Sequence, residues 1–392
     1  MGRSAVARAL AVGVPGLRRV RRPADASGPT FDLTYVRTGP RTSVPAVVIP
    51  GGPGLGSVVP YRALRRRAAR LGLDLIMVEH RGVGLSRTDL HGADLPGSAM
   101  RISAVVDDIA AVLDREGVRS AVVVGSSYGS YVASGFAARF PDRVEGLLLD
   151  SALQSAEVVE EERRAVRALF WEADTPVAQQ VRALYASGED DRRLLGVLRA
   201  AYELDGVDAV DPLLRRRGDR GPALAWRLLE AYADRSQSMA NVPGVYEFDL
   251  VGAIGFRELG YGATPDGLPL DPALTYAPIA HRFPPFVGEP FDLAREAPGF
   301  RWPVVLLSGS RDLRTPPAIA ERVAALAPFS TLVGIENGHS ALDTHPEALL
   351  RALTLLVAGR HRELPQQAAE LNRLPRRGIA ARSPALLRLL LQ

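Results

Sequence analysis

Ser127 lies at the centre of the pentapeptide Gly125-Ser126-Ser127-Tyr128-Gly129, between an apolar run and a helical stretch. The preceding run, Ala121-Val122-Val123-Val124, has the β-branched composition of a buried strand. A G-x-S-x-G sequence between a strand and a helix is typical of a sharp turn that exposes the serine hydroxyl. Glycines two residues before and after the serine let the neighbouring chain pass close by. We therefore predict that Ser127 is a nucleophile, with an ordinary strand-to-helix turn as the alternative.

Two further polar residues follow predicted buried strands far downstream. Asp312 lies in the loop after Val304-Val305-Leu306-Leu307, and His339 follows a strand predicted around Thr331-Leu332-Val333. Loops at the carboxyl ends of the strands of an open α/β sheet gather reactive groups. In acyl transfer by a serine, a histidine takes the proton of the serine hydroxyl, and an aspartate orients that histidine. We expect the other histidines to be surface or structural residues: His80, His91, His281, His345 and His361.

A glycine-rich loop follows an early predicted strand. Val47-Val48-Ile49 runs into Pro50-Gly51-Gly52-Pro53-Gly54. Such a loop can aim a backbone N–H group at the oxyanion of an acyl-transfer reaction, and the residue after the nucleophile supplies a second N–H group. We therefore assign the oxyanion hole to the N–H groups of Gly52 and Tyr128. The alternative is a plain turn rich in glycine and proline.

Together these residues resemble the α/β-hydrolase fold family, and within it the proline iminopeptidase and tripeptidyl aminopeptidase group. The chain order serine, aspartate, histidine is that of the α/β-hydrolase triad. The segment Glu79-His80-Arg81-Gly82-Val83-Gly84-Leu85-Ser86 is similar to the D-x-R-G-x-G-x-S element of that group, and Phe140-Pro141-Asp142-Arg143-Val144 has its F/Y-P-x-x-V form. The sequence departs from the group at Pro50, where a histidine is common, and at Glu79, where an aspartate is common.

The predicted strands and helices alternate, which indicates an α/β fold with a mostly parallel, doubly wound sheet. Between about Ser151 and Phe300, apolar residues recur at helical spacing and no clear strand is evident. We predict that this stretch is a helical cap, which would exclude water and select the substrate. The predicted division of the chain is a poorly ordered basic leader at 1–28, a first core part at 29–151, the cap at 152–300, a second core part at 301–360, and an Arg/Leu-rich tail at 361–392. We expect the tail to dock on the protein's own surface.

Recognition of a peptide N-terminus requires a group that holds its ammonium. Most cap glutamates, such as Glu160-Glu161-Glu162, are expected to be solvated. Glu258 differs because it ends the apolar segment Ala253-Ile254-Gly255-Phe256-Arg257. This segment resembles the A-I-x-C-x-E element of tripeptidyl aminopeptidases, with Phe256 in place of the cysteine. The resemblance implies that Glu258 binds substrate, while a structural ion pair with Arg257 or another arginine is the alternative.

Composition restricts the other possibilities. The 392 residues include no cysteine, which excludes disulfides and thiolate metal sites, and the 48 basic residues are all arginine. A formal net charge of +4 is mild, and we expect no nucleic-acid partner, no cofactor and no metal. The sequence contains no apolar run of about 18 residues, so it gives no indication of a membrane span. The apolar stretch near the N-terminus is short and is interrupted by Pro15 and Gly16. We therefore expect a cytoplasmic protein, with export as the alternative.

The sequence thus predicts a serine hydrolase that cleaves N-terminal residues from peptides through an acyl-enzyme. A carboxylesterase, thioesterase or lactonase of the same fold is the alternative, because acyl transfer uses the same site for all of these substrates. A small-molecule receptor with slow or no turnover is a third hypothesis, which the complete set of catalytic residues disfavours.

Overall fold

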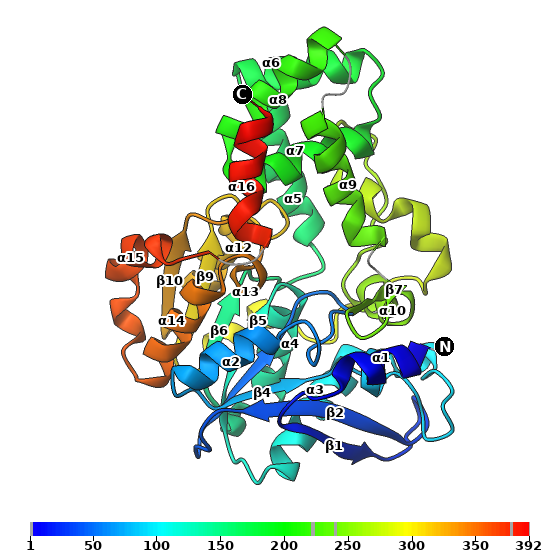
Figure 1. Ribbon diagram of the computed structural model, residues 1–392, viewed down its shortest axis with the longest axis vertical. Coiled ribbons are helices and arrows are strands. Elements are labelled where there is room, and N and C mark those ends of the chain that lie inside the picture. The colour runs from blue at the N-terminus through cyan, green and yellow to red at the C-terminus, as the bar shows by residue number, and fades with distance from the viewer. Residues whose placement is uncertain (1–2, 221–223, 239–240, 377–378, 392) are drawn as a thin grey trace.

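The computed structural model describes residues 3–220, 224–238, 241–376 and 379–391 (Figure 1). Within these residues an eight-stranded sheet forms the centre of the molecule. In spatial order its strands are β1 (Leu17–Arg22), β2 (Phe31–Thr38), β4 (Leu75–Val78), β3 (Ala46–Ile49), β5 (Ala121–Ser126), β6 (Val144–Asp150), β9 (Val304–Gly309) and β10 (Ser330–Ile335). Neighbouring strands from β4 to β10 are parallel, whereas β2 is antiparallel to both β1 and β4. The predicted mostly parallel sheet is confirmed.

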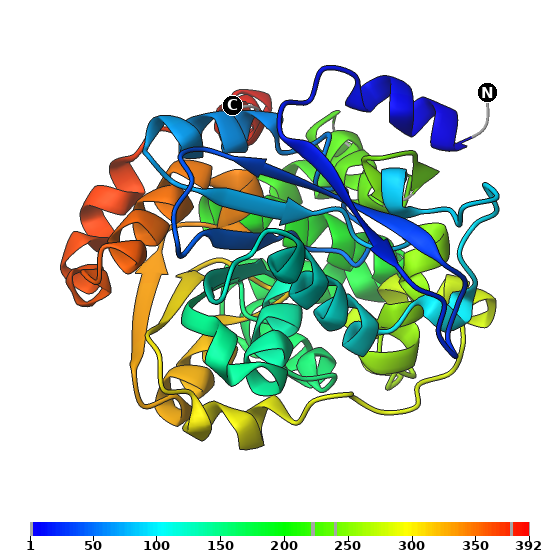
Figure 2. The same ribbon diagram turned by 90° about the horizontal axis from the view of Figure 1, so that it is seen from below.

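Helices cover both faces of the sheet (Figure 2). Because strands buried on both faces alternate their side chains between two cores, Val47 packs with one helical layer and Val48 with the other. The first layer consists of α3 (Ile102–Arg115), α4 (Tyr128–Arg139), α11 (Leu293–Glu296) and α12 (Pro317–Leu326). The second consists of α2 (Arg62–Arg70), α13 (Ala341–Thr344), α14 (Pro346–Val357) and α15 (Ala368–Arg373).

The segment predicted to be a poorly ordered leader, residues 1–28, includes two stretches of regular structure. It holds α1 (Arg3–Ala11) and the edge strand β1. Val20 of β1 packs against the main core, while Arg22 donates to Asp108 at 2.8 Å. The arginine-rich run becomes a strand because distant carboxylates neutralise its outward side chains. Residues 1–2 lie outside the described part of the chain.

The chain between β6 and β9 is mainly helical and lies above the carboxyl ends of the strands (Figure 1). Its long helices are α5 (Val158–Arg167), α6 (Pro176–Ala186), α7 (Asp191–Asp205), α8 (Val207–Arg220), α9 (Leu224–Ser238) and α10 (Phe248–Glu258). A small hairpin of β7 (Asn241–Val242) and β8 (Tyr246–Glu247) is also present, although the sequence showed no clear strand there. Two residues are too short a run for a recognisable alternation of apolar and polar side chains.

The C-terminal helix α16 (Ile379–Leu390) packs on the helical insertion, as expected for a tail that docks on the protein's own surface (Figure 1). Leu387 and Leu391 join the apolar cluster formed by α5 to α9. Within the described residues, no helix combines the length and apolarity needed to cross a membrane.

Candidate active site

Ser127 occupies a sharp turn between β5 and α4. Its backbone has φ 53° and ψ −123°, a strained combination for a residue with a side chain. The flanking glycines are required by close approaches, because a Cβ at Gly125 would collide with the carbonyl of Gly129. A Cβ at Gly129 would collide with the carbonyl of Ile49. The turn therefore has the geometry of a nucleophile elbow.

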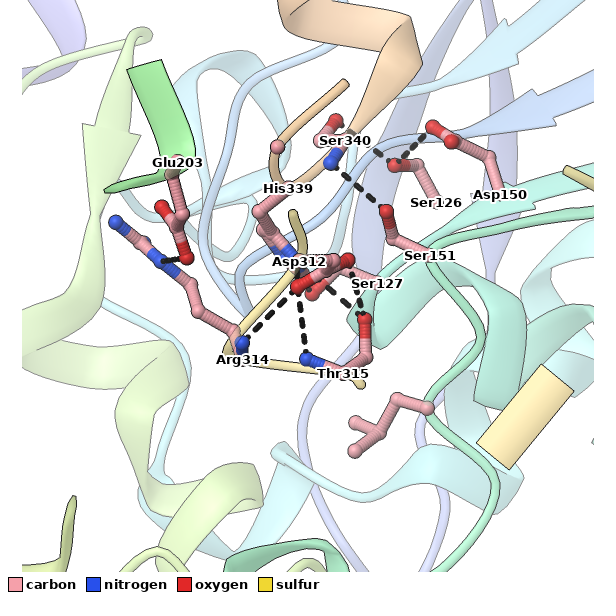
Figure 3. Close-up of polar contacts among 12 residues, drawn as sticks. Ser126, Ser127, Asp150, Ser151, Glu203, Asp312, Arg314, Thr315, His339 and Ser340 are labelled. Atoms are coloured by element: carbon pink, nitrogen blue, oxygen red, sulfur yellow. Dashed lines mark hydrogen bonds and ion pairs between the residues drawn. The ribbon is translucent and has the colours of Figure 1, made fainter. Parts of the chain in front are cut away.

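The structure brings Ser127, His339 and Asp312 together across more than 200 residues of sequence (Figure 3). His339 Nε2 lies 2.9 Å from Ser127 Oγ, and His339 Nδ1 lies 3.0 Å from both carboxylate oxygens of Asp312. With a proton on Nδ1 toward Asp312, Nε2 is free to accept the proton of the serine hydroxyl. The three residues thus form one continuous hydrogen-bonded chain.

The carboxylate of Asp312 is held in its ionised form. Burial favours the neutral acid, but the charge and hydrogen bond of His339 and the N–H group of Thr315 lower the pKa of Asp312 to about 2. Thr315 also donates its hydroxyl at 2.8 Å, and the N–H group of Arg314 donates at 2.9 Å. Burial tends to lower the pKa of His339, yet the Asp312 carboxylate raises it above its ordinary value. The pair is therefore arranged to stabilise an imidazolium.

A second buried carboxylate holds the loop that carries His339. Asp150 accepts hydrogen bonds from the N–H groups of Ala341 and Leu342, both at 2.9 Å, and from the hydroxyl of Ser126 at 2.7 Å. Burial raises the pKa of Asp150 to about 6, although all three donors oppose this shift. Figure 3 shows Asp150 and Ser126 on one side of the site, with Ser340 between them and His339. Asp150 therefore fixes the residue before the nucleophile relative to the residues after the histidine.

The glycine-rich loop after β3 passes close to Ser127. A Cβ at Gly51 would lie 3.3 Å from the Cβ of Ser127, and Gly52 faces the same cavity as Ser127. The carbonyl of Gly52 accepts a hydrogen bond from the Tyr261 hydroxyl at 3.1 Å. Tyr128 is the first residue of α4, so its N–H group belongs to the unpaired first turn of a helix. Both predicted oxyanion residues therefore lie beside Ser127.

The site opens into a cavity of about 860 Å³ beneath the helical insertion. Ser127 and His339 form part of its wall. Six aromatic side chains of tyrosine and phenylalanine line it: Tyr232, Tyr246, Phe248, Tyr261, Tyr276 and Phe283. Charged groups line it as well, including Glu162, Arg199 and Arg314. Among the described residues, no cluster of three His, Asp or Glu side chains is placed to hold a metal ion.

Glu258 lies elsewhere. It is 4 % exposed, and its Oε2 accepts a hydrogen bond from the N–H group of Ile102, at the start of α3, at 2.7 Å. Its nearest arginine, Arg101, is 3.8 Å from Oε1. Burial raises the pKa of Glu258, although the Ile102 bond and Arg101 oppose the shift. Glu258 is not among the described residues that line the cavity beside Ser127. These contacts agree with the alternative that Glu258 forms a structural ion pair. The arginine concerned is Arg101 and not Arg257.

A different glutamate, Glu162, faces the cavity, so the expectation that this residue is solvated was wrong. Its side chain is 17 % exposed, and burial raises its pKa to about 7 although Arg199 opposes the shift. The sequence did contain a signal for this position. Glu162 lies four residues after Val158 and four before Val166, both buried, so helical spacing places it on the inward face of α5.

The family comparison agrees with this geometry. Residues 45–346 match the α/β-hydrolase fold family, and the chain belongs to that family. A proline iminopeptidase structure from Mycobacterium smegmatis is 17 % identical, with a TM-score of 0.55 over 88 % of this chain and 99 % of that one. A thermophilic esterase from Thermogutta terrifontis is 21 % identical, with a TM-score of 0.51 over 88 % of this chain and 99 % of that one. At these identities the likeness concerns the fold.

Proposed function

We propose that this α/β hydrolase is a serine hydrolase that removes N-terminal residues from peptides through an acyl-enzyme. The observation that carries the proposal is the unbroken chain from Asp312 through His339 to Ser127, with contacts of 3.0 and 2.9 Å, at the wall of a large cavity. These distances are those needed for proton transfer between a nucleophile and its base.

The reaction follows from the roles of these groups. His339 Nε2 accepts the serine proton while Ser127 Oγ attacks the carbonyl carbon, and Asp312 stabilises the resulting imidazolium. The imidazolium then donates its proton to the leaving amine, and the acyl group remains as an ester of Ser127. A water molecule, deprotonated by His339, attacks this ester and releases the N-terminal residue.

The tetrahedral intermediate requires donors for its oxyanion. The backbone N–H groups of Gly52 and Tyr128 are assigned this role, supported by the close approach of the glycine-rich loop to Ser127 and by the position of Tyr128 at a helix N-terminus. Removing one such donor typically costs about 10²–10³ in kcat.

The ammonium of the peptide N-terminus needs a carboxylate inside the cavity. We assign this role to Glu162 in place of Glu258, because Glu162 faces the cavity that contains Ser127. The charges of Asp312 and His339 act on its carboxyl group, which indicates that it lies near the triad. A desolvated carboxylate of this kind gains more from a cation than a solvated one does.

Ester hydrolysis is the second candidate, and one observation favours it. The aromatic side chains form a continuous cluster, with the ring centroids of Phe248 and Phe283 5.6 Å apart and those of the stacked Tyr261 and Tyr276 4.8 Å apart. Such a wall would accept a neutral acyl chain as readily as a peptide side chain.

A panel of chromogenic substrates separates the two candidates. The purified protein is assayed with free-amine aminoacyl anilides, their N-blocked forms and simple esters. The proposal expects the free-amine compounds to have the highest kcat/KM, and cleavage of esters alone would refute it. A fluorophosphonate probe tests the site independently. Ser127→Ala should abolish labelling, whereas the neighbouring control Ser126→Ala should retain it.

A further inference from the structure

Two arginines that lie far apart in the sequence face the catalytic cavity. Arg199 comes from α7, and Arg314 follows the triad acid Asp312 by two residues. Both also line a side cavity of about 250 Å³ between α7 and α9. They therefore stand where the catalytic cavity and the side cavity meet.

Arg199 makes unusually weak polar contacts for a buried guanidinium. Its side chain is 13 % exposed, and its two contacts with described residues are both 3.5 Å, one to Glu162 Oε2 and one to Thr275 Oγ1. Charge-assisted hydrogen bonds of arginine are normally 2.7–2.9 Å, and the group has five N–H donors. Most of the hydrogen-bonding capacity of this cation is therefore available to a ligand.

The guanidinium of Arg314, like that of Arg199, makes few polar contacts, and the backbone of Arg314 is held in place. Its Nε is 3.3 Å from Glu203 Oε1, and the charge of Glu203 raises its pKa further, so it remains a cation. Its N–H group is bonded to Asp312, which holds this residue beside the triad. Figure 3 shows its side chain extending toward Glu203. With 37 % of the side chain exposed, the guanidinium has open space around it.

The neighbouring acids do not neutralise this pair completely. Glu203 supplies one negative charge beside Arg314. Burial raises the pKa of Glu162 to about 7, which weakens its negative charge near neutral pH. An ammonium bound at Glu162 would further weaken the hold of that residue on Arg199. The junction therefore favours a group with a single negative charge.

We propose that Arg199 and Arg314 bind the C-terminal carboxylate of a dipeptide whose N-terminal ammonium lies at Glu162. The inference rests on the proposed peptidase function. Two extended residues span at most about 7 Å. A dipeptide is therefore short enough for both charged ends to lie inside the cavity that Ser127, Glu162, Arg199 and Arg314 line together. The substrate class is thus free dipeptides rather than the N-termini of long chains.

The full-length protein is assayed with phenylalanylglycine and phenylalanylglycinamide, which differ only in the terminal charge. We expect kcat/KM to be at least about 10-fold higher for the acid. Arg199→Gln should lower this ratio toward 1; because Arg199 also pairs with Glu162, the separate values for acid and amide both respond, and the ratio between them is the readout. Arg199→Lys, which keeps the charge, should retain part of the ratio. The control Arg164→Gln, on α5 but exposed, outside both cavities and paired with Glu161 at 2.5 Å, should leave the ratio unchanged.

Failure of this inference is distinguishable from failure of the peptidase assignment. Equal kcat/KM for acid and amide in the parent protein, or an unchanged ratio in Arg199→Gln, would overturn the carboxylate subsite while the peptidase function stands. If only esters are cleaved, the peptidase function fails. The subsite is then judged by protection of Ser127 from fluorophosphonate. Protection by the acid at lower concentration than by the amide, lost in Arg199→Gln, supports it, and equal protection refutes it.

Discussion

The hydroxyl of Tyr261, in the helical insertion, donates a hydrogen bond of 3.1 Å to the carbonyl of Gly52, in the loop close to the nucleophile. The same loop is bonded to the hairpin of the insertion, where Glu247 donates to Gly54 and Gly56 donates to Val245, both at 2.9 Å. The insertion therefore shapes the loop to which the oxyanion hole is assigned, in addition to covering the cavity.

Tyr261→Phe should lower kcat and leave KM nearly unchanged, because the lost bond positions a group needed only in the transition state. Loss of one hydrogen bond of about 0.5–1.5 kcal/mol corresponds to a fall of about 2–12-fold. Tyr276→Phe is the matched control. Its ring stacks on Tyr261 at 4.8 Å, and its hydroxyl is bonded to no described residue. Similar losses in both variants would assign the effect to the aromatic wall and not to Gly52.

Asp312→Asn should give a folded protein whose kcat is lower by about 10²–10⁴, because the amide no longer selects the productive tautomer of His339. Steady-state kinetics together with thermal unfolding check this expectation. Asp343→Asn is the comparison, since Asp343 also faces the cavity but is bonded to Tyr61 and Ser340. If Asp343→Asn caused the larger loss, Asp343 would take the role of the acid.

Glu258→Gln should change stability little and should not discriminate between substrates. Glutamine keeps an oxygen that accepts from the first N–H group of α3, and the variant removes a charge that burial disfavours, so we expect a change of less than about 1 kcal/mol in the free energy of unfolding. Activity on free-amine and neutral substrates should change by the same factor. A loss of about 30-fold confined to free-amine substrates would instead support the role that the sequence resemblance implied.

Local patterns were sufficient to predict most strands of the sheet and the loops that bring Ser127, Asp312 and His339 together. Val47-Val48-Ile49 and Val304-Val305-Leu306-Leu307 are continuous apolar runs, and such runs are recognisable because both faces of their strands are buried. The edge strand β1 was not recognisable. Its residues between Leu17 and Arg22 are mostly arginine, and they form a strand because of carboxylates located elsewhere in the chain, such as Asp108.

Which residues of the helical insertion line the cavity could not be predicted from local patterns, because it depends on contacts between distant parts of the chain. Ser127 and His339 each follow a predicted strand, so their position at the carboxyl end of the sheet could be predicted. Glu258 and Glu162 both lie on helices of the insertion, and which of them reaches the cavity depends on how those helices pack. Tyr261 carries no local signal, because its hydrogen bond to Gly52 joins residues 209 positions apart.

The pH dependence of activity tests the role of Glu162. Its pKa of about 7 means that it gains charge, and with it the ability to hold an ammonium, as pH rises through 7. The substrate ammonium has a pKa of about 8 and is lost as pH rises further. For free-amine substrates kcat/KM should therefore be bell-shaped, with a maximum between about pH 7 and 8. N-blocked substrates should show one rising limb, from the loss of the His339 proton.

Glu162→Gln separates the ionisation of the glutamate from that of the histidine. In this variant kcat/KM for free-amine substrates should fall about 10-fold or more near pH 7.5 and should lose the dependence on the Glu162 proton. The values for N-blocked substrates should keep both their size and their single rising limb, because His339 is unchanged. If instead the two substrate classes lost activity equally, Glu162 would serve to hold Arg199 in place and would not bind the ammonium, since the ion pair between them is the other contact its carboxylate makes in the cavity.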